Sequence, residues 1–193
     1  MDLDQTDPAT IEAAVVTDRG TMVVTFFPEQ APKHVRNFLE LAQRGFYDGL
    51  TFHRIVKGFV IQAGCPHSRR GATGMVGTGG SGQRLLAEFS DLPHTRGTLS
   101  MARGTDPNSA SSQFFVVHGE HASHLDGSYS VFGRVEEGLE VLDQIASVEC
   151  GFGPNGGRDL PAERIEIRRV ELRPRQERAP AAEPQGREQQ GEA

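Results

Sequence analysis

Residues 52–64 read Phe-His-Arg-Ile-Val-Lys-Gly-Phe-Val-Ile-Gln-Ala-Gly, and this stretch predicts a β-hairpin. Two short runs rich in aromatic and β-branched residues flank a lysine–glycine pair, as in two strands joined by a tight turn. A two-residue loop would place Arg54 opposite Ile61, whereas a three-residue loop would place Arg54 opposite Gln62. We expect the second register, because it gathers an arginine and a glutamine on one face, with Phe59 at the tip beside them.

Two further stretches continue this pattern. Residues 99–117 begin and end with strand-like runs and enclose a loop of small and polar residues suited to turns. Residues 124–135 give a turn signal followed by another strand. Together, FHRIVKGFVIQAG, SMARGTDPNSASSQFFVV and HLDGSYSVFGRV strongly resemble the cyclophilin-type peptidyl-prolyl cis-trans isomerases, with Met-Ala-Arg similar to a bacterial-type subgroup. The resemblance extends from about Ala9 to Leu172.

The remaining signals predict an all-β fold with two helices. Residues 11–27 indicate a second hairpin, and an apolar stripe at helical spacing follows Pro32 and ends at Gly45. A second helix is expected over 139–146, and 165–172 predicts a closing strand whose phase slips once at a bulge. Many antiparallel strands with only two helices favour a barrel. The resemblance sharpens this to a closed eight-stranded antiparallel β-barrel capped by two α-helices.

Composition divides the chain into three parts. We expect an N-terminal leader over 1–8, the isomerase-like domain over 9–173 and a polar tail over 174–193. The tail contains no aromatic and no β-branched residue, so it cannot bury enough apolar area to offset the entropy of ordering. We therefore predict that the tail is disordered.

Composition also limits the partners. The chain has 193 residues, 36% of them hydrophobic, and a formal net charge of −6, which argues against a general nucleic-acid-binding protein. It shows neither a secretory signal nor a stretch long enough to span a membrane. Cys65 and Cys150 lie far apart; one disulfide is the alternative, but two reduced thiols are favoured. We expect a cytoplasmic monomer without nucleic-acid or membrane partners.

Two other patterns invite chemical interpretations. The glycine-rich segment 64–84 could cradle a phosphate, but no Gly-Lys-Ser/Thr follows it and no helix is indicated behind it. We interpret it as a long surface loop bordering the site, as in the resembling family. His118, His121 and His124 are spaced by three, which suits metal ligation on a helix, whereas this stretch reads as a loop without a supporting cysteine or carboxylate cluster. We expect no metal and no cofactor.

The resemblance implies catalysis of rotation about X–Pro bonds. This rotation has a barrier of roughly 20 kcal/mol but makes and breaks no covalent bond, so it needs no nucleophile. It needs an apolar slot for the proline ring and a donor for the twisted amide, whose nitrogen regains a lone pair. Arg54, always protonated and planar, is the expected donor, and Gln62 opposite would orient its guanidinium. Taken without the motif, Arg54 would be read as a solvated or ion-paired side chain.

The resemblance also implies a set of substrate-binding residues. Four of them would line the proline slot, although each alone would be read as core. Two would lie on an edge segment whose backbone groups hold an extended peptide, and the others would form polar or aromatic walls. The expected set is Phe59, Val60, Ala102, Arg103, Gln113, Phe115, His124, Leu125 and Tyr129.

The sequence departs from the family pattern at five of the matched positions. The family usually carries proline at Lys57, methionine at Val60, asparagine at Arg103, tryptophan or phenylalanine at His124 and histidine at Tyr129. Isomerase activity should survive these changes, while substrate preference should differ. The family's tryptophan offers the inhibitor cyclosporin a broad apolar face and an indole N–H. With histidine in its place, we expect cyclosporin to bind weakly.

Two classes of function stay open at this point. The first is an active isomerase acting on proline-containing peptides and on unfolded or partly folded proteins. The second is a proline-peptide binding module or chaperone that uses the same groove without catalysis. The joint presence of Arg54, Phe59, Gln62 and Phe115 favours the enzyme.

Overall fold

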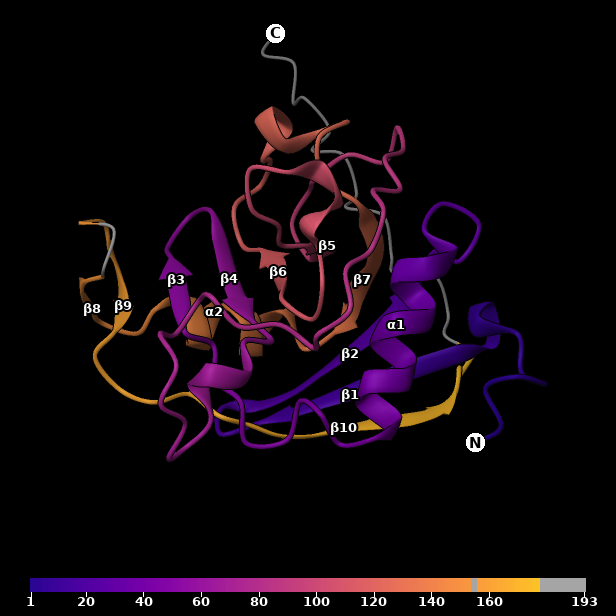
Figure 1. The fold of residues 1–193 in the computed structure, drawn as a ribbon, viewed down its shortest axis with the longest axis horizontal. Coiled ribbons are helices and arrows are strands. Elements are labelled where there is room, and N and C mark those ends of the chain that lie inside the picture. The colour runs from indigo at the N-terminus through magenta and orange to yellow at the C-terminus, as the bar shows by residue number, and fades with distance from the viewer. Residues whose placement is uncertain (154–155, 178–193) are drawn as a thin grey trace, which may run out of the picture.

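The computed structural model describes residues 1–153 and 156–177. In this part of the chain, eight strands form one antiparallel sheet in the order β10-β1-β2-β7-β5-β6-β4-β3 (Figure 1). The described α-helices are α1 and α2, and a separate hairpin is formed by β8 and β9. The bounds are β1 Ile11–Thr17, β2 Gly20–Phe26, α1 Pro32–Gln43, β3 Arg54–Val56, β4 Val60–Ala63, β5 Thr98–Met101, β6 Phe114–Val117, β7 Val131–Glu137, α2 Leu139–Ala146, β8 Cys150–Phe152, β9 Arg158–Pro161 and β10 Ile167–Pro174.

The hairpin of β3 and β4 has the expected register. Arg54 pairs with Gln62 and Val56 with Val60, so the three-residue loop is confirmed. Gly58 in that loop has φ +80°, a left-handed conformation that glycine adopts without steric cost. The local turn chemistry therefore brings the arginine and the glutamine side by side.

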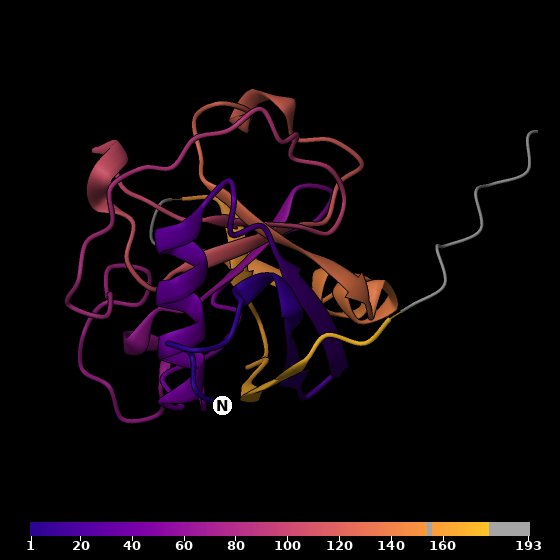
Figure 2. The ribbon, with the colours of Figure 1, turned by 90° about the vertical axis from the view of Figure 1, so that its right-hand side faces the viewer.

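Both predicted helices are confirmed. The stripe of Val35, Phe38, Leu39 and Ala42 on α1 is buried. The ring of Phe38 lies at the centre of an aromatic core, with centroids 5.0–5.6 Å from those of Phe26, Tyr47, Phe114 and Phe132. Figure 2 shows α1 and α2 on opposite sides of β1 and β2. The helices therefore cover the sheet without contributing to the site described below.

The strands β4 and β6 divide their apolar side chains between two clusters. Since side chains alternate along a strand, one face of each strand joins the main core and the other faces away from it. The second face carries its own apolar cluster, made of Val60, Phe115, Val117, Ala122 and Leu125, with Phe59, Ala102 and Tyr129 packed against it. This second cluster contains most of the apolar residues expected to bind substrate.

The prediction of a closed barrel is wrong. The sheet is a curled, open half-barrel with β10 and β3 at its two edges. The segment before β3 meets the start of β10 at an isolated bridge between Thr51 and Glu166, and the Phe52 N–H donates to the Ile165 carbonyl at 3.0 Å. The Gly49 N–H also donates to the Ile167 carbonyl and the Ile167 N–H to the Leu50 carbonyl, each at 2.8 Å. These contacts do not extend along β3, which is three residues long and has β9 lying against it (Figure 1).

The first residues of the chain pack on the domain. Leu3 is buried in the main core, and its carbonyl accepts a hydrogen bond from Arg36 Nη1 at 2.7 Å. At the other end, the predicted bulge is confirmed where β10 pairs with β1, and β10 continues to Pro174. The Arg175 N–H donates to the Thr10 carbonyl at 2.7 Å, so ordered structure extends beyond the expected boundary at residue 173. The predicted disorder of the tail from residue 178 onward lies outside the described residues.

Two further expectations concern the thiols and the membrane. Cys65 and Cys150 are both free thiols, as favoured from the sequence. Within the described ranges, no helix combines the length and the apolar character needed to cross a membrane.

Three histidines have lowered pKa values because of burial. Burial lowers the pKa of His53 from 6.5 to about 4 and also lowers the pKa values of His34 and His94. The carboxylates of Glu88 and Asp126, in contact with His34 and His94 respectively, oppose the shift of those two groups. The folded protein therefore resists protonation of these rings.

Lowering the pH from 8 to 4.5 should lower Tm. The unfolded chain binds a proton on these rings near pH 6.5, whereas folded His53 binds one only near pH 4, so the unfolded state gains protons first. The contribution of these histidines to stability is complete at pH values above their pKa in the unfolded chain. It is lost as the pH falls toward their pKa in the folded protein. For His53 alone the shift corresponds to about 3 kcal/mol. Thermal unfolding followed by circular dichroism measures this effect.

The matched control is the exposed His121. His121→Asn should show the same dependence of Tm on pH as the wild type, while His53→Asn should show a weaker one. Equal slopes for His53→Asn and the wild type would contradict the assignment.

Candidate functional site

A pocket of about 240 Å³ opens beside the β3–β4 hairpin. Four segments far apart in sequence build it: the hairpin, the residues after β5, strand β6 and the stretch from η4, Ser123–Leu125, to β7. The lining residues are Arg54, Phe59, Val60, Gln62, Ala102, Arg103, Phe115, Leu125 and Tyr129. All nine were predicted from the sequence as site residues.

The floor and sides of this pocket are apolar. Val60 is 2% exposed and Phe115 is 5% exposed, so both present a fixed surface. The Tyr129 ring meets the Phe115 ring edge-on at a centroid distance of 5.8 Å. Such a rigid aromatic and aliphatic surface suits a small apolar ring that enters from solvent.

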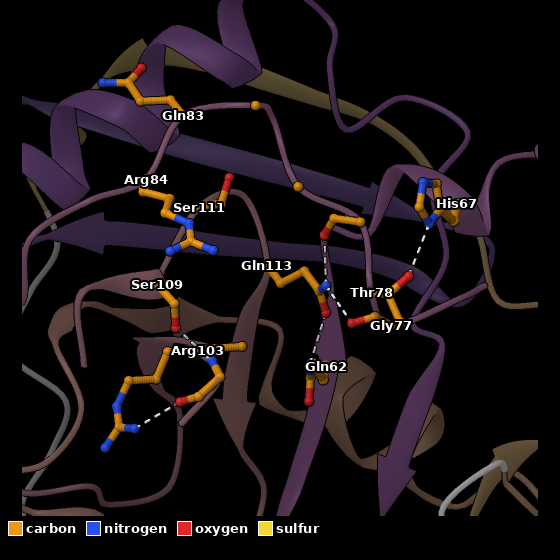
Figure 3. Close-up of a pocket in the computed structure, with 15 residues that line it drawn as sticks. Gln62, His67, Gly77, Thr78, Gln83, Arg84, Arg103, Ser109, Ser111 and Gln113 are labelled. Carbon is orange, nitrogen blue, oxygen red and sulfur yellow. Dashed lines mark hydrogen bonds between the residues drawn. The ribbon is translucent and has the colours of Figure 1, made fainter. Parts of the chain in front are cut away.

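A chain of hydrogen bonds forms the polar wall. Gln62 lies between Arg54 and Gln113: its Oε1 is 3.5 Å from Arg54 Nη1, and its Nε2 donates to Gln113 Oε1 at 3.0 Å. The Gln113 Nε2 in turn donates to the carbonyls of Gly77 and Gly79, each at 2.8 Å (Figure 3). Gln113 therefore anchors the glycine-rich loop to the sheet and orients Gln62.

Arg54 has a second partner that sequence reasoning missed. Its Nε donates to Asp159 Oδ2 at 3.0 Å, and Asp159 lies on β9, outside the main sheet. The two residues are separated by 105 positions in the chain, and no pattern around Asp159 signals the pairing. The arginine that was expected to act on substrate is thus held from two sides.

Arg103 uses its side chain within the protein. Its Nε and Nη2 donate to the Ser128 carbonyl at 3.1 and 2.9 Å, and its guanidinium carbon lies 4.5 Å from the centroid of the Tyr129 ring. These contacts brace the segment after β5 against the segment before β7. The neighbouring Ala102 N–H donates to the Gln113 carbonyl at 3.0 Å.

His124 stands at the rim of the pocket and does not line it. The residue is exposed on η4, and its ring centroid lies 5.1 Å from that of Phe59. A larger side chain at this position would extend the apolar surface that begins with Phe59.

A larger pocket of about 620 Å³ adjoins the first and shares Gln62, Ala102 and Arg103 with it. The glycine-rich loop forms one side, with Gly77 and Thr78 at the same end as His67 (Figure 3). This agrees with the expectation that the loop borders the site. The two pockets together make a continuous surface on either side of Gln62.

Comparison with known proteins decides the family. A family model described as cyclophilin-type peptidyl-prolyl cis-trans isomerase matches residues 13–172. The chain belongs to the cyclophilin-type isomerases. The family and the enzyme class expected from the sequence are thereby confirmed.

Individual relatives support the same assignment. A peptidyl-prolyl cis-trans isomerase of Synechococcus elongatus is 45% identical over 146 residues, covering 72% of this chain and 94% of that protein. Peptidyl-prolyl cis-trans isomerase B of Bacillus subtilis is 46% identical over 135 residues, covering 69% and 88%. The crystal structure of a Cryptosporidium parvum cyclophilin, determined in the presence of the dipeptide Ala-Pro, has a TM-score of 0.73 and 30% identity, and it covers 85% of this chain and 99% of its own.

In the present chain, sequence reasoning also missed a buried hydrogen-bonded set around His94, next to the 240 Å³ pocket. The His94 ring bonds to Asp126 Oδ1 through Nδ1 at 2.8 Å and to Ser100 Oγ through Nε2 at 3.0 Å, and it stacks 6.0 Å from the Phe115 ring. A Ser-His-Asp set suggests a hydrolase, but Ser100 is fully buried and so has no access to a substrate. The set supports Phe115 and the segment after η4.

His118, the first of the three histidines at 118, 121 and 124, has two partners within the protein. His118 Nδ1 accepts from the Gly58 N–H at 2.9 Å, and its Nε2 lies 3.1 Å from Asp143 Oδ1. Among the described residues, no group of three or more His, Cys, Asp or Glu side chains is arranged to hold a metal ion.

Proposed function

We propose that this cyclophilin accelerates X–Pro rotation by binding the proline ring in the 240 Å³ pocket and setting the Arg54 guanidinium beside the twisted amide. The observation that carries this proposal is the position of the Arg54 guanidinium on the wall of a pocket whose floor and sides are apolar. Arg54 is 36% exposed, so it reaches solvent and substrate while Gln62 and Asp159 hold it.

The electrostatic argument follows from amide chemistry. The enzyme lowers the barrier to rotation only if it stabilises the twisted amide more than the planar one. The prolyl nitrogen regains a lone pair in the twisted form, and a fixed guanidinium can donate to it. Each 1.4 kcal/mol or so of such preference gives about a tenfold gain in rate.

The substrate is proposed to be an extended peptide. The proline ring would occupy the smaller pocket, and a flanking residue would enter the adjoining pocket of about 620 Å³ past Gln62. The Cryptosporidium parvum cyclophilin, at 30% identity, was crystallised in the presence of Ala-Pro, which supports binding of proline peptides here. We also propose that the protein acts as a cytoplasmic monomer on partly folded proteins, and that it binds cyclosporin weakly.

The test is an isomerisation assay with an Ala-Pro peptide, run with and without EDTA. We expect acceleration above the uncatalysed rate that EDTA leaves unchanged. Peptide titration followed by NMR supplies the second measurement, because binding without acceleration would instead identify a proline-peptide binding module. Loss of rate with EDTA would point to a metal.

A further inference from the structure

We infer that Asp159 is a positioning residue for Arg54, held in place by the glycine-rich hairpin of β8 and β9. This inference rests on the proposed function, since it assigns Asp159 a role through Arg54. Asp159 itself does not line either of the pockets described above.

The contact with Asp159 uses the Nε–H of Arg54 and leaves N–H groups of the guanidinium available to a substrate. Asp159 Oδ2 accepts from Nε at 3.0 Å, while Nη1 lies 3.5 Å from Gln62 Oε1. An arginine held at Nε by a carboxylate and near Nη1 by an amide has few rotamers left. Its remaining N–H groups then keep one orientation toward the pocket.

Burial distinguishes this ion pair from the exposed pair Arg169–Glu171 on β10. The Asp159 side chain is 15% exposed, whereas the strand pair Arg169–Glu171 is 53% and 48% exposed. Water screens the exposed pair, but it screens the Asp159 contact much less. The interaction with Arg54 is thus suited to fixing a side chain.

The hairpin is shaped around the carboxylate. The Gly153 N–H donates to the Gly157 carbonyl at 2.7 Å. A Cβ on Gly153 would lie 2.3 Å from Asp159 Oδ1, so only glycine leaves the carboxylate its place. By contrast, a Cβ on Gly151 would meet nothing within 4 Å. Figure 1 shows β8 and β9 beside β3, the strand that carries Arg54.

The experiment compares kcat/KM of the full chain for an Ala-Pro peptide in single and double variants. Asp159→Asn should lower it about fivefold, and Glu163→Gln, a carboxylate-to-amide change a few residues along, should leave it unchanged. Gly153→Ala should lower it about threefold, and Gly151→Ala should not. In an Arg54→Ala background, Asp159→Asn should have no further effect, because its role passes through Arg54.

A second readout reports the contact without catalysis. The Arg54 Nε–H proton, followed by NMR, should exchange slowly with solvent in the wild type and faster in Asp159→Asn. Thermal unfolding should show that Asp159→Asn keeps the Tm of the wild type. This measurement distinguishes a role of Asp159 in orienting the Arg54 guanidinium from a role in stabilising the β8–β9 hairpin alone.

The outcomes are distinct. If Arg54→Ala loses activity while Asp159→Asn keeps it, the inference is overturned and the proposed function stands. If Asp159→Asn costs as much in the Arg54→Ala background as in the wild type, Asp159 acts independently of Arg54 and the inference is also overturned. If Arg54→Ala is itself fully active, both the proposed mechanism and the inference about Asp159 are overturned.

Discussion

Replacing Arg54 by alanine is expected to lower kcat/KM for an Ala-Pro peptide at least tenfold. In the proposed mechanism the Arg54 guanidinium, which lines the 240 Å³ pocket, stabilises the twisted amide only if it is present and oriented. A tenfold loss corresponds to about 1.4 kcal/mol of transition-state stabilisation, which a single charge-assisted hydrogen bond supplies. The loss should appear in kcat more than in KM, because the apolar walls that bind the ring are intact. Coupled isomerisation assays and NMR exchange at saturating peptide measure the two quantities.

Two variants control this prediction. Arg54→Lys keeps the charge as a compact ammonium and should recover part of the rate, since it cannot reproduce the planar set of donors. Arg134→Ala removes an arginine of β7 that is 57% exposed and lies outside the pocket, and it should leave the activity unchanged. Full activity in Arg54→Ala, with its fold verified by circular dichroism, would remove Arg54 from the mechanism.

The second large effect is expected with cyclosporin. His124→Trp should tighten its binding at least tenfold while changing kcat/KM less than severalfold. The His124 ring lies at the pocket rim, 5.1 Å from the Phe59 ring, so an indole there would extend the apolar surface and add an N–H donor. An aromatic contact and a hydrogen bond together contribute roughly 2–3 kcal/mol, or about a thirtyfold to hundredfold change in Kd. His124 lines neither of the two pockets proposed to bind a small peptide, so the turnover of such peptides should scarcely respond.

The control for this variant is another exposed histidine of the same segment. His121→Trp adds an equal indole at an exposed position outside the lining of both pockets and should leave the affinity for cyclosporin at the wild-type value. Calorimetric titration of the three proteins measures it. Low-nanomolar binding by the wild type, or no gain in His124→Trp, would show that the rim does not contact the inhibitor.

Short-range patterns were sufficient for most elements of the fold. The register of Arg54 opposite Gln62 followed from turn length and side-chain alternation, which are local properties. The helix from Pro32 and the bulge in β10 were likewise predictable from the sequence. Both depend on the spacing of apolar residues over a few neighbouring positions, with a period of 3.6 for the helix and a break in a period of 2 for the bulge. The apolar pocket residues came from motif resemblance, and the structure gathers them around one cavity.

Contacts between distant segments were decided by the tertiary structure. The open edge of the sheet depends on where β3 ends relative to β10, and neither strand encodes that relation. The same holds for the side-chain partners of the site. Asp159 meets Arg54 across 105 residues, and Gln113 meets the carbonyls of the glycine-rich loop across more than 30. A hydrogen bond between such groups requires positions within about 3 Å, which only the folding of the whole chain sets. The residues proposed to touch the proline, and Gln62 beside Arg54, were therefore visible in the sequence, whereas the contacts of Asp159 with Arg54 and of Gln113 with the glycine-rich loop were visible only after folding.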